Sequence, residues 1–164
     1  MLDAFAIYDF PCGNGTLAIS PMPGRTRHYY TDWLHLMAWK PNLVVTMTLQ
    51  AELDRKGAGT LGADLTNEGI EWVHFPVPDM GVPLKDHWSE TRKQALRTFN
   101  VGGKVLVHCF GGCGRSGMIC LRLMIAAGEE PQAALARLRR ARPCAIETDA
   151  QMDWATQDDA PERL

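Results

Sequence analysis

The chain has 164 residues, 46% of them hydrophobic, and a formal net charge of −2 at pH 7. This length and composition predict one globular domain over residues 1–164. Proteins that bind nucleic acid usually have a basic surface, so the charge argues against nucleic acid as the main partner. No apolar run is long enough to cross a membrane, and no basic segment precedes the first apolar residues, so we expect neither a membrane anchor nor a secretory leader.

The cysteines indicate a reducing compartment. They are odd in number and lack the spacing of a disulfide framework. The five positions are Cys12, Cys109, Cys113, Cys120 and Cys144. Because disulfides are rare in the cytosol, we expect a cytoplasmic protein with free thiols.

The first third of the chain predicts a hairpin, a helix and a buried strand. Short strands over residues 5–8 and 16–19 flank the pair Asn14-Gly15, which is typical of a hairpin turn. A helix is expected between residues 31 and 41. The β-branched run over residues 43–47 predicts a parallel strand that is buried on both faces.

The next segment contains a glycine motif whose flanking residues do not suit nucleotide binding. Residues 57–62 read Gly-Ala-Gly-Thr-Leu-Gly, the literal spacing of a dinucleotide-binding loop. Such a loop must follow a strand directly and begin a long helix, whereas this copy follows the charged, helical segment 52–56. We therefore interpret it as an ordinary loop, followed by a short helix over residues 61–68 that Gly69 ends.

The rest of the chain alternates strands with helices. A strand over residues 70–75 must stop at the segment 76–83, because its three prolines remove backbone donors. We then expect a helix over 87–100, a strand over 105–107, helices over 118–127 and 132–142, and a last helix capped by Thr148. This alternation predicts a single-domain α/β fold with a mostly parallel central sheet and helices on both faces.

The most informative stretch is residues 108–117, which joins a predicted strand to a predicted helix. Its three internal glycines let successive N–H groups face inward as an anion nest, aided by the helix dipole. Cys109 opens this loop and Arg115 closes it with a planar fork suited to two phosphate oxygens. A thiol in such a cationic nest should have a lowered pKa. Cys109 is therefore a candidate nucleophile for phosphorus.

The pattern His-Cys-x5-Arg-Ser resembles the signature of the cysteine-based protein phosphatases. The likeness is to their dual-specificity branch, in particular to the kinase-associated phosphatases, which read His-Cys-Tyr-Gly-Gly-Leu-Gly-Arg-Ser. It extends from about Leu17 to Trp154. The resemblance implies the cysteine-phosphatase fold and a hydrolase without cofactor or metal. It would cleave phosphotyrosine, and also phosphoserine or phosphothreonine, through a cysteinyl-phosphate intermediate.

Roles within the signature follow from residue types and from the resemblance. Cys109 is the expected nucleophile, and Ser116 is expected to donate to its thiolate; in the resembled family this serine helps sulfur leave, and helix capping is the alternative. His108 is expected to fix the loop by a hydrogen bond, unless it is only a satisfied core histidine. The expected phosphate-binding groups are Phe110, Gly111, Gly112, Cys113, Gly114 and Arg115.

A general acid must protonate the leaving group, and Asp79 is the candidate. It lies in a proline-flanked loop after a strand, as the acid of the resembled family does. Asp86 and Asp64 are the rivals, although Asp86 suits helix capping and Asp64 falls in a short helix.

Residues 145–151 resemble the family element Ile-Gln-Thr-x-x-Gln, which positions the hydrolytic water. Gln151 matches this element, whereas Glu147 stands where the family has glutamine. A carboxylate near a phosphoryl group should repel it unless it is protonated or turned away. Both residues are candidates for positioning water.

Several other interpretations remain open. The arginines at positions 137, 139, 140 and 142 suit a solvated helix end better than a site for an acidic partner. A zinc site at His108, Cys109 and Cys113 lacks a well-spaced second ligand pair. Cys113 could instead trap a sulfenate on Cys109, with packing as the alternative and with Cys12 and Cys144 as other resolving thiols.

The sequence favours a phosphoprotein as substrate over a phosphoinositide, because the signature loop has no lysine, whereas inositide-cleaving relatives have lysines there. The alternatives are a phosphoprotein-binding module with little turnover, a phosphatase for a non-protein phosphate, and an enzyme that handles sulfur or arsenate. The natural substrate and the oligomeric state are not predicted.

Overall fold

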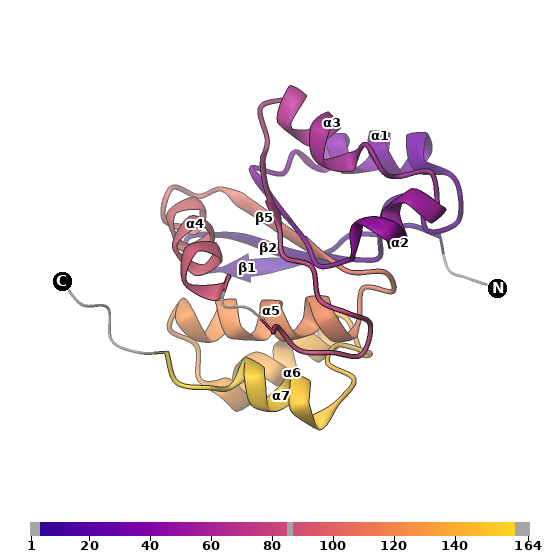
Figure 1. Ribbon diagram of the computed structural model, residues 1–164. Coiled ribbons are helices and arrows are strands. Elements are labelled where there is room, and N and C mark those ends of the chain that lie inside the picture. The colour runs from indigo at the N-terminus through magenta and orange to yellow at the C-terminus, as the bar shows by residue number, and fades with distance from the viewer. Residues whose placement is uncertain (1–3, 85–86, 160–164) are drawn as a thin grey trace.

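The computed structural model describes residues 4–84 and 87–159 (Figure 1). Its sheet has five strands in the order β1-β2-β5-β3-β4. The strands are β1 (Tyr8–Cys12), β2 (Gly15–Ser20), β3 (Leu43–Thr46), β4 (Glu71–His74) and β5 (Lys104–His108). The helices are α1 (Tyr29–Trp39), α2 (Gln50–Arg55), α3 (Leu61–Asn67), α4 (Trp88–Asn100), α5 (Gly114–Ala126), α6 (Pro131–Ala141) and α7 (Asp149–Ala155).

Helices cover both faces of this sheet, so apolar side chains are buried on both. Along β5, Val105 and Val107 pack toward α4, α5, α6 and α7, and Leu106 packs toward α1, α2 and α3. All three side chains are fully buried. Figure 1 shows the two helical layers on opposite sides of the sheet. The predicted α/β fold with helices on both faces is confirmed.

The first strand differs from its prediction. β1 covers residues 8–12 rather than 5–8, and its register pairs Cys12 with Gly15, so Gly13 and Asn14 form the turn. Pro11 is tolerated inside β1 because this strand lies at the edge of the sheet and pairs only with β2. β1 runs antiparallel to β2, whereas the other neighbouring strands run parallel, which makes the sheet mixed but mostly parallel.

The parallel strands direct three connections to one edge of the sheet. The segment from β3 to α2, the loop after β4 and the signature loop after β5 all leave from carboxyl ends of strands. In open α/β sheets this edge is where ligands bind. The fold therefore brings the signature close to two segments that lie far from it in sequence.

The helices agree with most sequence expectations. The glycine motif over residues 57–62 connects α2 to α3 rather than a strand to a long helix, as we interpreted it. α5 begins at Gly114, four residues earlier than expected, so the end of the signature forms its first turn. None of the described helices has both the length and the apolar character needed to cross a bilayer.

Candidate active site

The signature loop leaves β5 at His108 and enters α5 at Gly114. Gly112 has a φ of +70°, and a Cβ at this position would lie 2.5 Å from both the nitrogen of Pro21 and the carbonyl carbon of Ser20. Only glycine can adopt this conformation so close to another backbone. The tight curl of the loop against the end of β2 therefore depends on Gly112.

The carbonyl groups of the loop point to its outer side. Gly111 accepts a hydrogen bond of 2.9 Å from Arg142 Nη2, and Gly112 accepts one of 3.1 Å from Arg142 Nε. The Phe110 carbonyl accepts from the N–H group of Met22 at 3.1 Å. Arg142 thus holds the back of the loop, which corrects the expectation that its cluster is only a solvated helix end.

Two further arginines of that cluster also have structural partners. Arg139 donates to the carbonyl groups of Ala145 and Ile146 at 3.0 and 3.3 Å. Arg137 forms an ion pair of 2.7 Å with Glu129. The end of α6 is therefore bound to neighbouring backbone and side chains rather than left to solvent.

Backbone N–H groups of the loop remain available on its inner side. Within the described residues, the N–H groups of Phe110, Gly111, Gly112 and Cys113 donate no hydrogen bond to the protein. Unpaired N–H groups that converge in a curled loop form an anion-binding concavity. This arrangement is the one that the sequence predicts for phosphate.

Cys109 and Ser116 meet at the base of this concavity. The sulfur of Cys109 lies 3.1 Å from the hydroxyl oxygen of Ser116. Both residues are buried, Cys109 with 3% of its surface exposed and Ser116 with none. The serine hydroxyl is thus within hydrogen-bond distance of the sulfur, and its donation to a thiolate stays a prediction.

Arg115 is fixed by a residue that sequence analysis did not identify. Its Nη1 and Nη2 donate to the two carboxylate oxygens of Glu52 at 2.8 Å each, and Nη1 also donates to the Val77 carbonyl at 2.9 Å. Arg115 is only 2% exposed. The fork formed by Nε and the second N–H of Nη2 is left for a ligand.

The charge of Glu52 is stabilised by the same contacts. Burial would raise the pKa of Glu52, but hydrogen bonds from Arg115 and from the Leu49 N–H group outweigh it and lower that pKa. In return, Glu52 keeps the pKa of Arg115 raised in spite of its burial. Glu52 lies in the first turn of α2. In the sequence it is one of several charged residues in this segment, and nothing there distinguishes it from the others.

Asp79 lies beside Arg115, on the loop after β4. Its Oδ1 is 3.5 Å from Arg115 Nη2, and the side chain is 74% exposed. The Val77 carbonyl that contacts Arg115 belongs to the same loop. The rival Asp64 lies elsewhere, because it accepts hydrogen bonds from Tyr29 and Thr60 between α1 and α3. The other rival, Asp86, is outside the described residues.

His108 fixes the backbone at the start of the loop. Its Nε2 lies 2.8 Å from the hydroxyl oxygen of Thr46, and its Nδ1 lies 3.3 Å from the Cys109 carbonyl. Trp72 donates to the same hydroxyl at 2.8 Å. Because the Cys109 carbonyl can only accept, Nδ1 carries the imidazole proton, and the Thr46 hydroxyl, which accepts from Trp72, directs its own proton to the unprotonated Nε2. Burial lowers the pKa of His108 to about 4, so the ring is neutral at pH 7.

Glu147 and Gln151 approach the loop from its C-terminal side. Glu147 accepts a hydrogen bond of 2.8 Å from the N–H group of Gly114, so this N–H is already paired. Gln151 accepts from the Glu147 N–H at 2.9 Å and donates to the Gly81 carbonyl at 3.2 Å. Gln151 therefore joins the segment before α7 to the loop that carries Asp79.

A disulfide joins Cys113 to Cys144, with 5.1 Å between their Cα atoms. The expectation of free thiols is wrong for this pair, and Cys113 is available neither to a sulfenate on Cys109 nor to zinc. Cys144 is excluded as a resolving thiol for the same reason. The free cysteines are Cys12, Cys109 and Cys120, all buried. Burial raises the pKa of Cys12 to about 12, which makes this thiol a poor nucleophile.

Comparisons with known proteins place the chain in a family of phosphatase domains. A family model described as "Swiss Army Knife protein, DSP-PTPase phosphatase domain" matches residues 22–155. Cyclin-dependent kinase inhibitor 3 of Rattus norvegicus is 35% identical over 89 residues, which are 52% of this chain and 42% of that protein. Human tyrosine-protein phosphatase non-receptor type 18 is 34% identical over 85 residues, 45% of this chain and 18% of that protein. The chain thus matches less than half the length of these curated relatives.

Solved structures show the same fold. Kinase associated phosphatase, in a form whose catalytic-site cysteine is replaced by serine, has a TM-score of 0.82 and 22% identity, with 95% of this chain and 94% of that chain covered. The active form of Tk-PTP has a TM-score of 0.69 and 30% identity, with 94% and 95% covered. These similarities extend over nearly the whole chain.

Proposed function

We propose that this chain, which belongs to the family of DSP-PTPase phosphatase domains, hydrolyses phosphate monoesters on proteins through a cysteinyl-phosphate intermediate. Phosphotyrosine is the proposed substrate, with phosphoserine and phosphothreonine as further substrates. The observation that carries the proposal is the position of the Cys109 sulfur, 3.1 Å from the Ser116 hydroxyl, at the base of a loop with unpaired N–H groups.

In the first step, the Cys109 thiolate attacks phosphorus and the bond from phosphorus to the substrate oxygen breaks. The loop N–H groups and the free fork of Arg115 hold the equatorial phosphoryl oxygens, where negative charge must be stabilised in the transition state. Asp79, 3.5 Å from Arg115, gives its proton to the leaving oxygen. The products of this step are the dephosphorylated side chain and cysteinyl-phosphate.

In the second step, water attacks the same phosphorus and sulfur leaves as thiolate. Ser116 donates its hydroxyl hydrogen to the departing sulfur, which lowers the energy of the thiolate. Asp79, now a carboxylate, accepts a proton from the attacking water. Gln151 and Glu147 lie next to Gly114, where they contribute to positioning that water.

A protein substrate is favoured over an inositol lipid by the signature loop. The five residues between Cys109 and Arg115 include no lysine. Loop recognition therefore depends on backbone N–H groups and on one arginine, which suits a single phosphate on a side chain. Cytoplasmic location stays a prediction, and the disulfide does not favour it.

Turnover of an aryl phosphate tests the proposal. The wild type should release phosphate, vanadate should inhibit it, and Cys109→Ser should abolish turnover while still binding vanadate. Cys12→Ser is the matched control, because Cys12 is also a buried free cysteine but lies in β1. Turnover by Cys109→Ser near the wild-type rate would contradict the mechanism, and phosphopeptide binding without turnover by the wild type would identify a binding module.

A further inference from the structure

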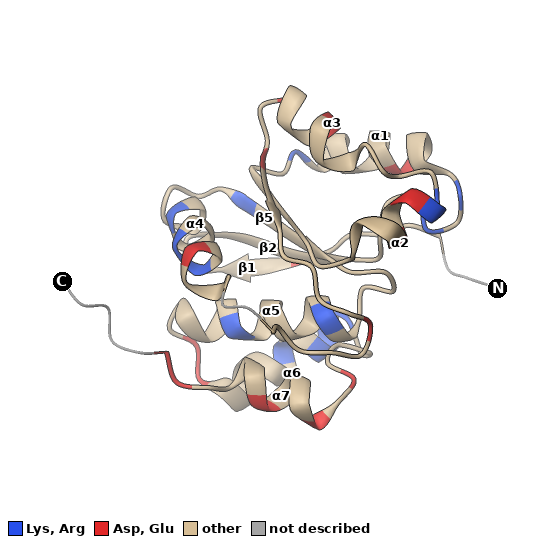
Figure 2. Ribbon diagram, in the orientation of Figure 1, with Lys and Arg blue, Asp and Glu red and all other residues tan. Residues whose placement is uncertain are grey.

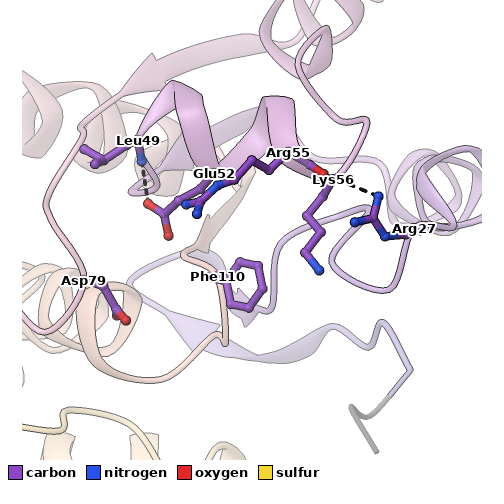
Figure 3. Close-up of a pocket in the computed structure, with 7 residues that line it drawn as sticks. All are labelled: Arg27, Leu49, Glu52, Arg55, Lys56, Asp79 and Phe110. Atoms are coloured by element: carbon purple, nitrogen blue, oxygen red, sulfur yellow. Dashed lines mark hydrogen bonds between the residues drawn. The ribbon is translucent and has the colours of Figure 1, made fainter.

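A cleft opens on the α2 side of the signature loop. Its volume is about 540 Å³. The residues that line it are Arg27, Leu49, Glu52, Arg55, Lys56, Asp79 and Phe110. Figure 3 shows Asp79 and Glu52 toward one end, Arg27 and Lys56 toward the other, and the Phe110 ring between them. The cleft thus extends from the catalytic arginine and the acid loop toward a group of basic side chains.

The basic side chains of the cleft, Arg27, Arg55 and Lys56, form no salt bridge with a carboxylate of the described residues. Arg27 and Arg55 donate to the carbonyl groups of Arg55 and Ala51 at 3.5 and 3.3 Å, and the Lys56 ammonium lies 5.8 Å from the centre of the Phe110 ring. Arg55 also helps, after Arg115, to lower the pKa of Glu52, whereas Arg27 and Lys56 lie at the far end of the cleft from that carboxylate (Figure 3). The charges of Arg27 and Lys56, with part of that of Arg55, are therefore available to a ligand.

The nearby carboxylates do not cancel this charge. Glu52 is paired with the buried Arg115. Asp54, also on α2, accepts a hydrogen bond of 2.9 Å from Gln50 and does not line the cleft. The field at the basic end is therefore positive.

A fourth cation supports the floor of the cleft. The Arg25 guanidinium lies 6.0 Å from the centre of the Phe110 ring, and only 8% of the residue is exposed. Its Nε has no hydrogen-bond partner among the described atoms. A buried cation without a carboxylate partner strengthens the positive potential around it, because screening is weak away from water.

We propose that this cleft binds a second anionic group of the phosphoprotein substrate, either an acidic side chain or a second phosphate near the phosphorylated residue. This inference rests on the proposed function. Phe110 directly follows the nucleophile Cys109 in the chain, so a group held over its ring belongs to the substrate region close to the reacting phosphate. The basic end of the cleft then selects substrates by charge, while the signature loop performs the reaction.

The test compares peptides that differ only beside the phosphorylated residue. Four peptides carry Asp, Ala, Lys or phosphoserine at the same neighbouring positions, and kcat/KM is measured for each at low ionic strength. The wild type should favour Asp over Lys by about tenfold, because two or three exposed charge pairs each contribute a factor of about two to five. This preference should fall as salt is raised.

The variant Arg55→Gln/Lys56→Met should lose most of this preference while its turnover of a small aryl phosphate stays unchanged. The matched control is Lys93→Met/Arg97→Gln, which removes the same charge from exposed positions on α4, away from α2 (Figure 2). This control should keep the wild-type preference. If phosphoserine raises kcat/KM more than Asp does, relative to the Ala peptide, phosphate is the preferred anion. If phosphoserine and Asp raise kcat/KM equally, a carboxylate is sufficient.

Three outcomes overturn the inference while the proposed function stands. They are equal kcat/KM for the Asp and Lys peptides in the wild type, a preference that persists in Arg55→Gln/Lys56→Met, and an equal loss in the α4 control. Cleavage of an inositol polyphosphate that depends on Arg55 and Lys56, without any peptide preference, would replace the peptide by a different substrate class. If the wild type hydrolyses no phosphate ester, the proposed function fails and this inference fails with it.

Discussion

The carboxylate of Glu52 accepts two parallel hydrogen bonds of 2.8 Å from the end of the Arg115 guanidinium. This pair connects α2 to the first turn of α5 and leaves the side of the guanidinium free for phosphate. Both side chains are almost fully removed from water, with 2% of Arg115 and 11% of Glu52 exposed. The orientation of Arg115 is thus set before substrate binds.

Glu52→Gln should therefore impair both folding and catalysis. It leaves a buried guanidinium without its counter-charge, and breaking a buried pair costs about 3–5 kcal/mol. Because the side chain of Gln still accepts one hydrogen bond, we expect the lower end of that range in urea unfolding. Misplacement of Arg115 should reduce kcat/KM for an aryl phosphate about 100-fold. Arg55→Gln, in the same helix, should keep both properties, and an unchanged kcat/KM for Glu52→Gln would show that Arg115 needs no such support.

His108 gives stability a defined dependence on pH. Its pKa is lowered from 6.5 to about 4 in the folded state by burial. The unfolded chain therefore binds a proton between these values that the folded chain does not, and stability falls as pH decreases from about 6.5 to about 4. The loss from this residue is about 3 kcal/mol.

Urea unfolding at several pH values measures how the free energy of unfolding changes with pH. The His108→Asn variant should lose this pH dependence between about pH 4 and 6.5, even if the variant is less stable than the wild type at every pH. Glu52 contributes to stability in a separate pH range. Because its pKa is lowered in the folded state, its contribution is lost only as the pH falls below about 4.5, the ordinary pKa of a glutamate. An equally steep slope in His108→Asn between pH 4 and 6.5 would assign the titration to another group.

Asp79→Asn should slow poor leaving groups far more than good ones. An alkoxide or a basic phenoxide needs a proton as it leaves, whereas an acidic phenol does not, so we expect a loss of about 100- to 1,000-fold only for the former. Asp64→Asn is the control, since Asp64 binds Tyr29 away from the signature. If Asp79→Asn shows the wild-type dependence on leaving-group pKa, Asp86 becomes the next candidate.

Glu147→Gln should strengthen anion binding without loss of structure. The glutamine oxygen can still accept from Gly114, but the negative charge beside the phosphate loop is removed. We expect vanadate to inhibit at a concentration lower by about threefold to tenfold, the scale of one nearby charge. Burst kinetics should show a larger change in dephosphorylation than in phosphorylation. Glu68→Gln, at the exposed end of α3, is the control and should change neither vanadate inhibition nor the burst kinetics. Equal effects of Glu147→Gln on phosphorylation and dephosphorylation would show that Glu147 does not contact the hydrolytic water.

Cys144→Ser, or reduction of the wild type, should lower the free energy of unfolding. The bridge closes a loop across a sequence separation of 31, for which chain entropy gives about 3–4 kcal/mol. Reductant should shift the urea midpoint of the wild type but not that of Cys144→Ser, which serves as the control. Thiol titration of the unreduced, denatured protein should find the three free cysteines. Five thiols and a midpoint insensitive to reductant would show that the bridge does not form in solution.

The parts of the site that adjoin one another in sequence could be predicted. Cys109, Arg115 and Ser116 lie within one strand-loop-helix unit, whose local spacing already fixes their relative positions. The position of Asp79 near this edge of the sheet could be predicted from the proline-rich loop after a strand, since parallel strands direct their ends to a common edge. Asp79 is indeed beside Arg115, although its catalytic role stays a prediction.

The contacts that the sequence did not reveal join distant segments. Glu52 and Arg142 lie 63 and 27 residues from Arg115, and their partners are set by how α2 and α6 pack on the sheet. The Cys113–Cys144 bridge forms because α6 returns alongside α5 and brings the segment before α7 to the loop. Periodicity and motif spacing contain no information on such packing. The early start of α5 at Gly114 was missed because glycines usually indicate a loop.

The hydrogen bonds that connect Trp72, Thr46 and His108 also give the protein an optical reporter. The indole N–H of Trp72 donates to the hydroxyl that contacts the imidazole, and its ring stacks on His74 at a centroid distance of 5.2 Å. A proton gained by His108 would reverse the hydrogen bond to Thr46 and so change the polarity around this fluorophore. Emission from Trp72 therefore follows the protonation of His108, the residue directly before the nucleophile, without any label in the concavity itself.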